Sequence, residues 1–370
     1  LHPVYYDAPH LDRAYNTSGS YLFGGAMLVA PIVEPIDSTA GQTRVNQTTW
    51  LPPGDWLPWS GAAVHSSGDS GLDVTAEYAI DALPMFVRTG AVVPLRTNHS
   101  LLQTVAFSDP LVWAVFVGTA KAAKVAGGSG VVVEDDGATV RHETHNATAT
   151  TLMTWAMRSA DELVLTVSAT DGSFDVDGCA NAEVGWEYAG ANVQELMDAA
   201  DTGSAESCCA ACGSFSNCAF WTFFPPSPST EPPTATLPSN GQASEASSTR
   251  SRCSLKVSRR GRRGHPSAVS GAAPRRMPTT RSHGFQLRSP RFAAAPPSAV
   301  TVNGQALRPI APADAGEVGW FVQPAGAPAG LSRAPPGAVV ILTPSAKLSE
   351  GFEVVVVAAG GRQSQFAQTP

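Results

Sequence analysis

Residues 151–168 read TLMTWAMRSADELVLTVS, two apolar runs joined by a short polar link. Similar runs precede them at 83–94 (LPMFVRTGAVVP), 111–117 (LVWAVFV) and 130–133 (GVVV). β-Branched and aromatic residues favour strands, whereas the Gly, Asp and Asn residues between the runs favour turns. Short runs at this regular spacing are typical of the sheets of a β-sandwich.

The same pattern returns towards the end of the chain. It covers residues 299–303 (AVTVN), 318–322 (VGWFV), 338–343 (AVVILT) and 351–358 (GFEVVVVA). Because the runs on both sides of the intervening segment look alike, the sequence predicts one β-sandwich that is interrupted by an insertion.

Two further segments lie in the N-terminal quarter of the chain. MLVAPIV at 27–33 has the length of a strand, and WLPPGDWLPW at 50–59 alternates aromatic and turn residues, with a tight connection expected at its Pro-Pro-Gly. Trp50, Trp56 and Trp59 are compatible with sugar stacking, but we favour the interpretation that they are buried aromatic residues of a sandwich.

The composition fits a globular protein rich in turns. The chain has 370 residues, of which 43% are hydrophobic and only 15% charged, with 34 Gly, 30 Pro and 8 Trp. This length suggests two or three domains, each large enough to bury a core. The few charges and many turn residues disfavour a coiled coil, a helical repeat and a basic nucleic-acid-binding protein.

Basic residues are concentrated in one stretch. Residues 225–300 hold 12 of the 24 Lys and Arg residues but only two acids, so the stretch carries +10 and the rest of the chain −17. With 12 Pro and 14 Ser, it is expected to be largely disordered. The run Arg259, Arg260, Arg262 and Arg263 has no interleaved aromatic residues, which favours a solvated linker over a nucleic-acid patch. A retained intron is the alternative left open.

Two features of the sequence bear on membrane insertion and on the compartment. No stretch reaches 18 consecutive apolar residues, so no transmembrane helix is expected. The chain begins at Leu1, with neither Met nor a signal peptide and inside a motif, which indicates a fragment. Four Asn-x-Ser/Thr sequons are glycosylation candidates and favour secretion: Asn16, Asn46, Asn98 and Asn146.

All six cysteines lie in a single short region of the chain. They are Cys179, Cys208, Cys209, Cys212, Cys218 and Cys253. Such clustering is typical of a small module stapled by disulfides. Zinc is the rival interpretation, but a closed zinc site usually needs two short-spaced ligand pairs, and no His is suitably placed here. A helix is expected at 203–212, with Ser204 as its cap.

Catalytic motifs are missing from the sequence. It has no G-x-S-x-G, H-E-x-x-H, phosphate loop or Rossmann glycine fingerprint, so we assign no catalytic, cofactor-binding or metal-binding residue and expect no cofactor. His142 and His145 in RHETH lack the four-residue helical spacing for a shared metal, and on a strand they would face opposite sides. We expect both at the surface.

Glu134-Asp135-Asp136-Gly137 is the most tempting catalytic candidate, because paired carboxylates can hydrolyse a glycosidic bond. It stands between GVVV and ATVRHE, however, which predicts a β-hairpin turn with the Gly at positive φ. We favour this structural interpretation.

The order of these segments resembles a known family. VYYDAPHLDRAYNTSGSYLFGGAMLVAPIVEP at 4–34 is similar to the end of the catalytic barrel in glycoside hydrolase family 31, the α-glucosidase family. The resemblance continues through WLPPGDWLPWSG at 50–61, ALPMFVRTG at 82–90, Val92-Val93-Pro94, Asp109-Pro110-Leu111, VVVEDDG at 131–137 and VTVNG at 300–304. It covers residues 1–178 and 299–358 in the order of the family.

This resemblance implies retaining hydrolysis of terminal α-glucosidic bonds by two aspartates. In the family both come from barrel strands upstream of the matched region, so the chain as given is expected to be inactive. Two departures stand out: His2 lies where the family has Arg, and Gly25-Ala26 lies where it has an acid.

The insertion resembles a PAN/Apple module. The matching segments are GWEYAGANVQEL at 185–196, SAESCCAACGSFSNCAFWTF at 204–223 and CSLK at 253–256. The resemblance implies a helix stapled to a small sheet by three disulfides, which pair Cys208 with Cys253, Cys212 with Cys218 and Cys179 with Cys209. It also implies a glycan or protein ligand, against the alternative of a passive stabilised insert.

Together these observations predict a mainly β protein: the end of a (β/α)8 barrel followed by two β-sandwich domains. The expected domains are the barrel end (1–24), a proximal sandwich (25–98), a distal sandwich (99–178 and 299–362), the PAN/Apple-like insert (179–257) and a disordered linker (258–298).

The expected function is that of the C-terminal part of an α-glucosidase of the secretory pathway, in the endoplasmic reticulum, lysosome, vacuole or outside the cell. Its substrate would be an oligosaccharide or glycan bound by the barrel. The alternative is a non-catalytic carbohydrate- or protein-binding protein that carries a PAN module. Neither hypothesis involves nucleic acid or a membrane span.

Overall fold

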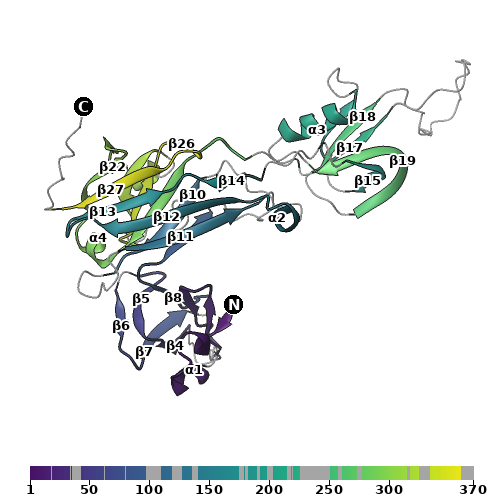
Figure 1. Cartoon of the computed structure of the whole chain (residues 1–370). Helices are drawn as coiled ribbons and strands as arrows, with labels where there is room; N and C mark the ends of the chain where they lie inside the picture. Colours follow the sequence, from purple (N-terminus) through teal and green to yellow (C-terminus); the bar gives the residue numbers. More distant parts are fainter. Residues whose placement is uncertain are drawn as a thin grey trace, which may run out of the picture.

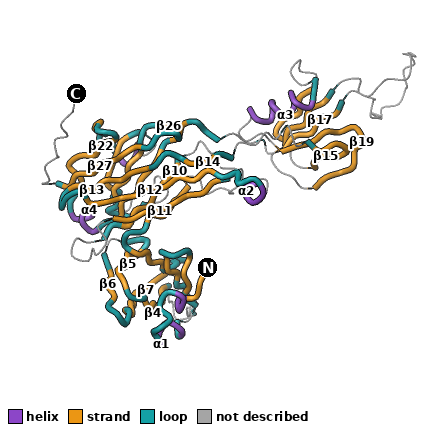
Figure 2. The backbone as a smooth tube through the Cα atoms, in the orientation of Figure 1, coloured by secondary structure: helices purple, strands orange, loops and turns teal. Residues whose placement is uncertain are grey.

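Strands dominate the computed structural model of the chain (Figure 1; Figure 2). The structure describes residues 1–17, 19–33, 35, 43–61, 63–79, 81–96, 110–118, 127–135, 141–174, 179, 182–189, 192–197, 203–214, 218, 220–225, 251–256, 261–272, 277–314, 317–324 and 334–359. These residues form three units, which we call the N-terminal β unit, the central sandwich and the cysteine module. None of the described helices is long and apolar enough to cross a bilayer.

The N-terminal β unit contains two sheets, one of six strands in the order β1-β2-β3-β8-β5-β6 and the ribbon β4-β7. Its elements are β1 (His2–Pro3), the 3-10 turn η1 (Val4–Tyr6), α1 (Asp12–Tyr15), β2 (Tyr21–Phe23), β3 (Met27–Val29), β4 (Arg44–Leu51), β5 (Gly54–Pro58), β6 (His65–Ser67), β7 (Leu72–Ala79) and β8 (Met85–Arg88). Gly71 has φ +80, and a Cβ there would lie 2.5 Å from the ring of Trp50. Glycine is therefore needed where this turn meets the core.

The central sandwich packs two sheets face to face. One has the strand order β24-β25-β21-β10-β9, and the other β11-β12-β13-β27-β22-β23. The elements are β9 (Val92–Arg96), β10 (Leu111–Phe116), β11 (Gly127–Glu134), α2 (Arg141–Thr144), β12 (Ala149–Met157), β13 (Glu162–Val167), β14 (Asp171–Gly172), β20 (Thr280–Arg281), β21 (His283–Arg288), α4 (Pro290–Ala294), β22 (Pro297–Val302), β23 (Gln305–Ala306), η4 (Pro312–Asp314), β24 (Gly319–Val322), β25 (Val339–Leu342), β26 (Ala346–Lys347) and β27 (Phe352–Ala358). Buried side chains from both sheets, Trp113 and Phe285 against Trp155 and Val356 among them, share one core.

The cysteine module has its own five-stranded sheet, in the order β15-β19-β17-β18-β16. Its elements are β15 (Glu183–Ala189), β16 (Asn192–Met197), α3 (Ala205–Ser214), β17 (Phe220–Phe224), β18 (Arg252–Lys256) and β19 (Gly261–Ala272). In Figure 1 the module stands at one end of the central sandwich, away from the N-terminal β unit. The expected helix is present but begins and ends two residues later, and Ser204 Oγ accepts a hydrogen bond from the backbone N–H of Ser207 at 3.1 Å, as a cap does.

Strands from both sides of the insertion pair with one another, as the sequence predicts. β13 pairs with β27 along Glu162↔Val357, and β10 runs parallel to β21 along Leu111↔His283. The insertion therefore leaves one sandwich after β14 and returns to the same sandwich at β20.

The expected disordered linker at 258–298 is wrong for its described parts. Residues 261–272 form β19, which pairs with both β15 and β17, and residues 283–288 form β21, every residue of which is buried. The difference has a physical cause: a high positive charge predicts solvated side chains, but Arg281 and Arg288 are buried and hydrogen-bonded. Residues 258–260 and 273–276 of this linker, and residues 226–249 of the longer stretch expected to be disordered, lie outside the described residues.

Two expected domain boundaries also move. β9 pairs with β10, so residues 92–96 belong to the central sandwich and not to the proximal domain that was expected to reach 98. The chain crosses between the units at Gly90, whose φ is +94 and whose N–H donates to the carbonyl of Phe116 at 2.7 Å. The boundary at 24/25 falls inside the β2–β3 hairpin, which is one continuous part of the six-stranded sheet.

The pairing across the insertion gives a first testable prediction. A site-specific protease sequence placed between residues 226 and 249 would allow the chain to be cut there, with the disulfides then reduced. We expect the two fragments to elute together in size-exclusion chromatography, because β10–β21 and β13–β27 join them within one core. Fragments that separate without denaturant would contradict a single interrupted sandwich.

A buried histidine gives a second prediction. His283 accepts a hydrogen bond from Trp113 Nε1 at 3.1 Å, and its pKa is lowered to about 3, mainly by burial and further by the charge of Arg281. The unfolded chain takes up this proton near pH 6.5, so the stabilisation is complete above pH 6.5 and is lost as the pH falls towards 3.

Between pH 6.5 and 5 we expect His283 to remove about 2 kcal/mol of unfolding free energy, near the limit of about 1.4 kcal/mol per pH unit for one group. The measurement is urea unfolding at both pH values for the natural chain, H283Q and the exposed control H145Q. Equal pH dependence in all three proteins would contradict the assignment.

Candidate functional site

In the acidic segment 134–137, the catalytic candidate of the sequence, Glu134 has a structural role. Glu134, the last residue of β11, is buried and accepts a hydrogen bond from Arg281 at 2.7 Å, while Arg96 lies 3.6 Å from its other oxygen. The expected hairpin is present, because β11 pairs antiparallel with β12 from Glu134↔Ala149 onward, but its strands are joined by a longer connection that carries α2 instead of a short turn. Asp136 and Gly137 lie outside the described residues.

The two histidines of RHETH lie at the surface, as expected, although on and next to a helical turn instead of a strand. His142 is within α2 and lies 3.6 Å from a carboxylate oxygen of Asp135, and His145 follows the helix. Within the described ranges, no group of three or more His, Cys, Asp or Glu side chains is placed to hold a metal ion.

Trp50, Trp56 and Trp59 are buried or partly buried, as the sequence led us to favour. Trp50 and Trp56 are buried, and Trp56 Nε1 donates to the carbonyl of Pro52 at 2.9 Å. Arg88 stacks over Trp56, 4.3 Å from the ring centroid, and also forms an ion pair with Asp7. Trp59 is partly buried beneath the guanidinium of Arg288. Because they are buried, Trp50 and Trp56 cannot stack on a sugar.

An exposed group of aromatic rings lies at the N-terminal edge, which we call the aromatic face: His2, Tyr5, Tyr6 and Tyr15. Tyr5 and Tyr15 are stacked with ring centroids 4.9 Å apart, and Tyr6 lies 5.2 Å from Tyr5 and 5.7 Å from His2. Tyr6 and Tyr15 are 66% and 57% exposed. Phe23, 60% exposed, follows on β2, the strand that pairs with β1.

Exposed rings that are stacked on one another form a platform, either for a second protein surface or for a sugar. Sequence reasoning missed this face. The signal in the sequence is the Tyr5-Tyr6 pair. Adjacent residues of a strand point to opposite faces, so a strand here would bury one tyrosine and expose the other.

The cysteine module contains three disulfides, in the pairs that its resemblance implied. They are Cys179–Cys209, Cys208–Cys253 and Cys212–Cys218, and no free cysteine remains. Cys208, Cys209 and Cys212 come from one face of α3 and pack with the buried Trp221 and Leu255. Three disulfides suggest an oxidising compartment.

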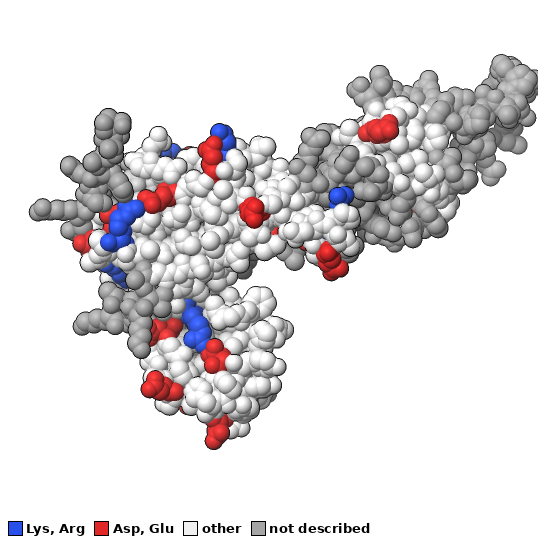
Figure 3. Space-filling model, in the orientation of Figure 1, with Lys and Arg blue, Asp and Glu red and all other residues white. Residues whose placement is uncertain are grey.

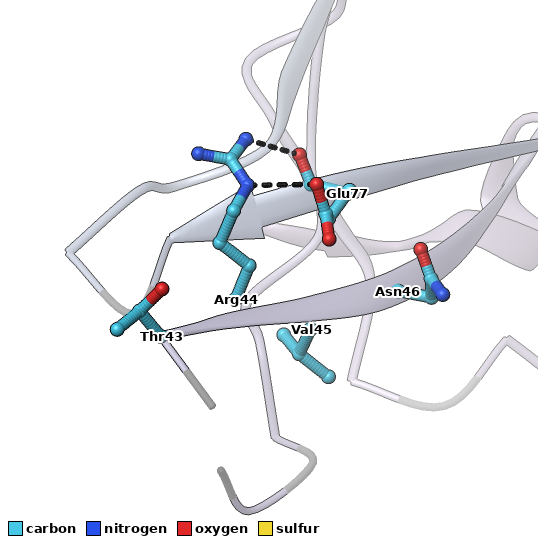
Figure 4. Close-up of a pocket in the computed structure, with 5 residues that line it drawn as sticks. All are labelled: Thr43, Arg44, Val45, Asn46 and Glu77. Carbon is cyan, nitrogen blue, oxygen red and sulfur yellow. Dashed lines mark hydrogen bonds and ion pairs between the residues drawn. The ribbon is translucent and has the colours of Figure 1, made fainter. Parts of the chain in front are cut away.

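A hollow of about 310 Å³ lies on the β4–β7 ribbon (Figure 4). It is lined by Thr43, Arg44, Val45, Asn46 and Glu77. Arg44 Nε donates to Glu77 Oε2 at 2.9 Å, and Arg44 Nη2 donates to the Glu77 carbonyl at 3.0 Å. On the face of the molecule drawn in Figure 3, the described residues are mostly uncharged, with Lys, Arg, Asp and Glu side chains scattered among them.

Two of the other sequons can be placed. Asn16 is exposed after α1, where its Nδ2 donates to the carbonyl of Asp12 at 3.4 Å. Asn146 is exposed with φ 51, in the left-handed region that Asn tolerates. Asn98 lies outside the described residues.

Comparison with known protein families confirms both resemblances. Residues 1–93 match the glycosyl hydrolase family 31 C-terminal domain, and residues 186–256 match the PAN domain. The first match contains the aromatic face and most of the N-terminal β unit, and the second contains most of the cysteine module.

Individual relatives are distant. An isomaltosyltransferase of Sporosarcina globispora is 34% identical over 91 residues, which are 24% of this chain and 7% of that protein. Neutral alpha-glucosidase C of Homo sapiens is 26% identical over 98 residues, 26% of this chain and 10% of that protein. The chain thus spans a tenth or less of the length of these two relatives.

Among solved structures, a family 31 dextranase of Flavobacterium johnsoniae in complex with glucose aligns with a TM-score of 0.51 at 13% identity. The alignment covers 96% of this chain and 28% of the dextranase chain. At this identity the likeness concerns the fold.

The buried ion pair gives a third prediction. In E134Q, Arg281 loses its carboxylate partner in a buried position, so we expect a loss of about 3–5 kcal/mol of unfolding free energy. The double variant E134M/R281M should recover most of it, because no buried charge remains.

The matched control is E350Q, which removes the exposed pair with Lys347 and should leave stability nearly unchanged, because water screens an exposed pair. Chemical unfolding of the four proteins measures these differences. Equal losses for E134Q and E350Q would show that burial does not strengthen the Glu134 pair.

Proposed function

We propose that the chain is the β-domain portion of a family 31 α-glucosidase-like enzyme, in which it supports a catalytic barrel through the aromatic face. The observation that carries this proposal is the position of that face. Tyr5, Tyr6 and Tyr15, together with Phe23, lie on the segment that matches the family's C-terminal domain. Contiguous exposed aromatic rings at one edge of a domain are typical of an interface.

The N-terminal β unit can hold such an interface rigidly. Asp7, which follows the aromatic residues of η1, is tied by an ion pair to Arg88 of β8. The Tyr15 hydroxyl donates to the carbonyl of Pro9 at 3.0 Å. These contacts fix the rings before a partner surface arrives, which reduces the conformational entropy lost on packing.

Retaining glycosidases need two carboxyl groups about 5 Å apart on either side of the scissile bond. Glu134 is engaged by Arg281 and buried, so it cannot serve in such a pair. The proposal therefore assigns catalysis to two aspartates of the barrel and a terminal α-glucosidic bond of an oligosaccharide as the substrate. The cysteine module would contact glycan or protein, and the disulfides support a location in the secretory pathway.

A non-catalytic binding protein is the second candidate, and the PAN match favours it independently of the barrel. The coding sequence upstream of Leu1 distinguishes the two. A barrel with an Asp-Met pair after its fourth strand supports the enzyme, whereas a reading frame without a barrel supports the binding protein.

The fourth prediction concerns activity. Purified 1–370 should release no glucose from maltose or a nitrophenyl α-glucoside, because both catalytic carboxylates are assigned to the barrel. Turnover above buffer that survives D135N and D136N would overturn this assignment of roles.

In the chain extended through the barrel, Y6S and F23S should lower activity and thermal stability together, since they disturb the proposed packing. V133S is the control, because Val133 is also 60% exposed but lies on β11 of the central sandwich. An effect of V133S as large as that of Y6S would count against a role of the aromatic face.

A further inference from the structure

A glycosylation sequon lies on the ribbon β4–β7, and its modification does not depend on the proposed glycosidase activity. Asn46, Gln47 and Thr48 form a sequon within β4. In an extended strand residues two apart share a face, and here Asn46 and Thr48 are exposed while Gln47 is buried. Both residues that an N-glycosyltransferase recognises therefore point to solvent.

The Asn46 carboxamide is also available for chemistry. Among the described residues none hydrogen-bonds with it, in contrast to Asn16, whose Nδ2 donates to Asp12. Figure 4 shows Asn46 on the same side of the ribbon as Arg44 and Glu77, with Val45 turned to the other side. The pairing register sets Asn46 directly opposite Glu77.

We propose that Asn46 carries an N-linked glycan, and that the innermost N-acetylglucosamine lies in the hollow formed with Arg44 and Glu77. The volume of about 310 Å³ is at the lower end for small-molecule sites and is appropriate to a single sugar ring. The guanidinium donates and the carboxylate accepts, so the pair can hydrogen-bond to the hydroxyl and acetamido groups of the sugar.

The compartment agrees with this modification. The three disulfides suggest an oxidising environment, the kind in which N-glycosylation of secreted proteins also takes place. The donor is a lipid-linked glycosyl diphosphate. The Asn46 Nδ2 forms a bond to the anomeric carbon, the bond from that carbon to the diphosphate oxygen breaks, the lipid diphosphate leaves, and the amide loses one proton.

The first experiment maps occupancy. The full chain is secreted from a glycosylating host, treated with a glycan-releasing amidase in heavy-oxygen water and digested for peptide mass mapping. We expect heavy-oxygen Asp at position 46 in the natural chain and in T48S, and its loss in T48V. N46Q should lack one glycan by intact mass.

The matched control is T75V. Thr75 Oγ1 and Thr48 Oγ1 share a hydrogen bond of 2.8 Å, so T48V and T75V remove the same contact but only T48V destroys the sequon. Retained occupancy in T75V with loss in T48V supports the proposal. An unmodified Asn46 in the natural chain overturns it.

The second experiment tests the hollow. The rate at which the amidase releases the Asn46 glycan is measured on native and on denatured protein. We expect slower release from the native chain, and R44A or E77A should speed native release by about three- to tenfold, the effect of one net hydrogen bond. D73A is the control, because Asp73 lies on the same exposed face of β7 outside the hollow. Equal native and denatured rates would exclude packing of the sugar in the hollow.

Discussion

The guanidinium of Arg288 holds the N-terminal β unit against the central sandwich. It belongs to β21, yet it donates to the carbonyl of Trp59 at 2.6 Å and to Gln286 Oε1 at 2.9 Å. It also stacks on Trp59, at 4.1 Å, and on Phe116, at 5.0 Å. Burial of the guanidinium lowers the pKa of Arg288 to about 9, because it disfavours the charged form.

This contact links residues 229 positions apart in the chain. The segment that matches family 31 is therefore oriented by a strand that follows the whole cysteine module. Trp155 of the central sandwich adds a contact where the two units meet, since its Nε1 donates to the carbonyl of Gly90 at 3.1 Å. The contact between the N-terminal β unit and the central sandwich therefore requires β21, which follows the insertion in the chain. This makes the two halves of the sandwich interdependent.

Most central strands could be predicted from the sequence, because β10, β12, β13 and β27 are apolar runs of ordinary length. β21 could not: HGFQLR contains two basic residues and lies in a stretch of high positive charge. Its His283 and Arg288 are satisfied by Trp113, Trp59 and Gln286, partners that only the tertiary structure brings near. Net charge in a sequence window cannot distinguish a solvated arginine from a buried one.

The candidate sites were predictable to different degrees. The disulfide pairs followed from a resemblance to a whole motif, whereas the hollow depends on the register in which the strands RVNQTTWL and LDVTAEYA pair, and the alternation of side chains does not set that register. The aromatic face was hidden for the opposite reason. Its tyrosines look like core residues, and only the geometry of η1 and α1 turns them outward.

The cysteine module is built around a core of its own. Its core consists of its own cysteines with Trp221, Phe223 and Leu255, separate from the core of the central sandwich. Disulfides that close 6, 30 and 45 residues lower the entropy of the unfolded module, by more for the longer loops. A module stabilised in this way needs no support from the sandwich core. The core of the cysteine module shares no buried side chain with the core beneath the aromatic face, so a substitution in one core is not expected to disturb the packing of the other.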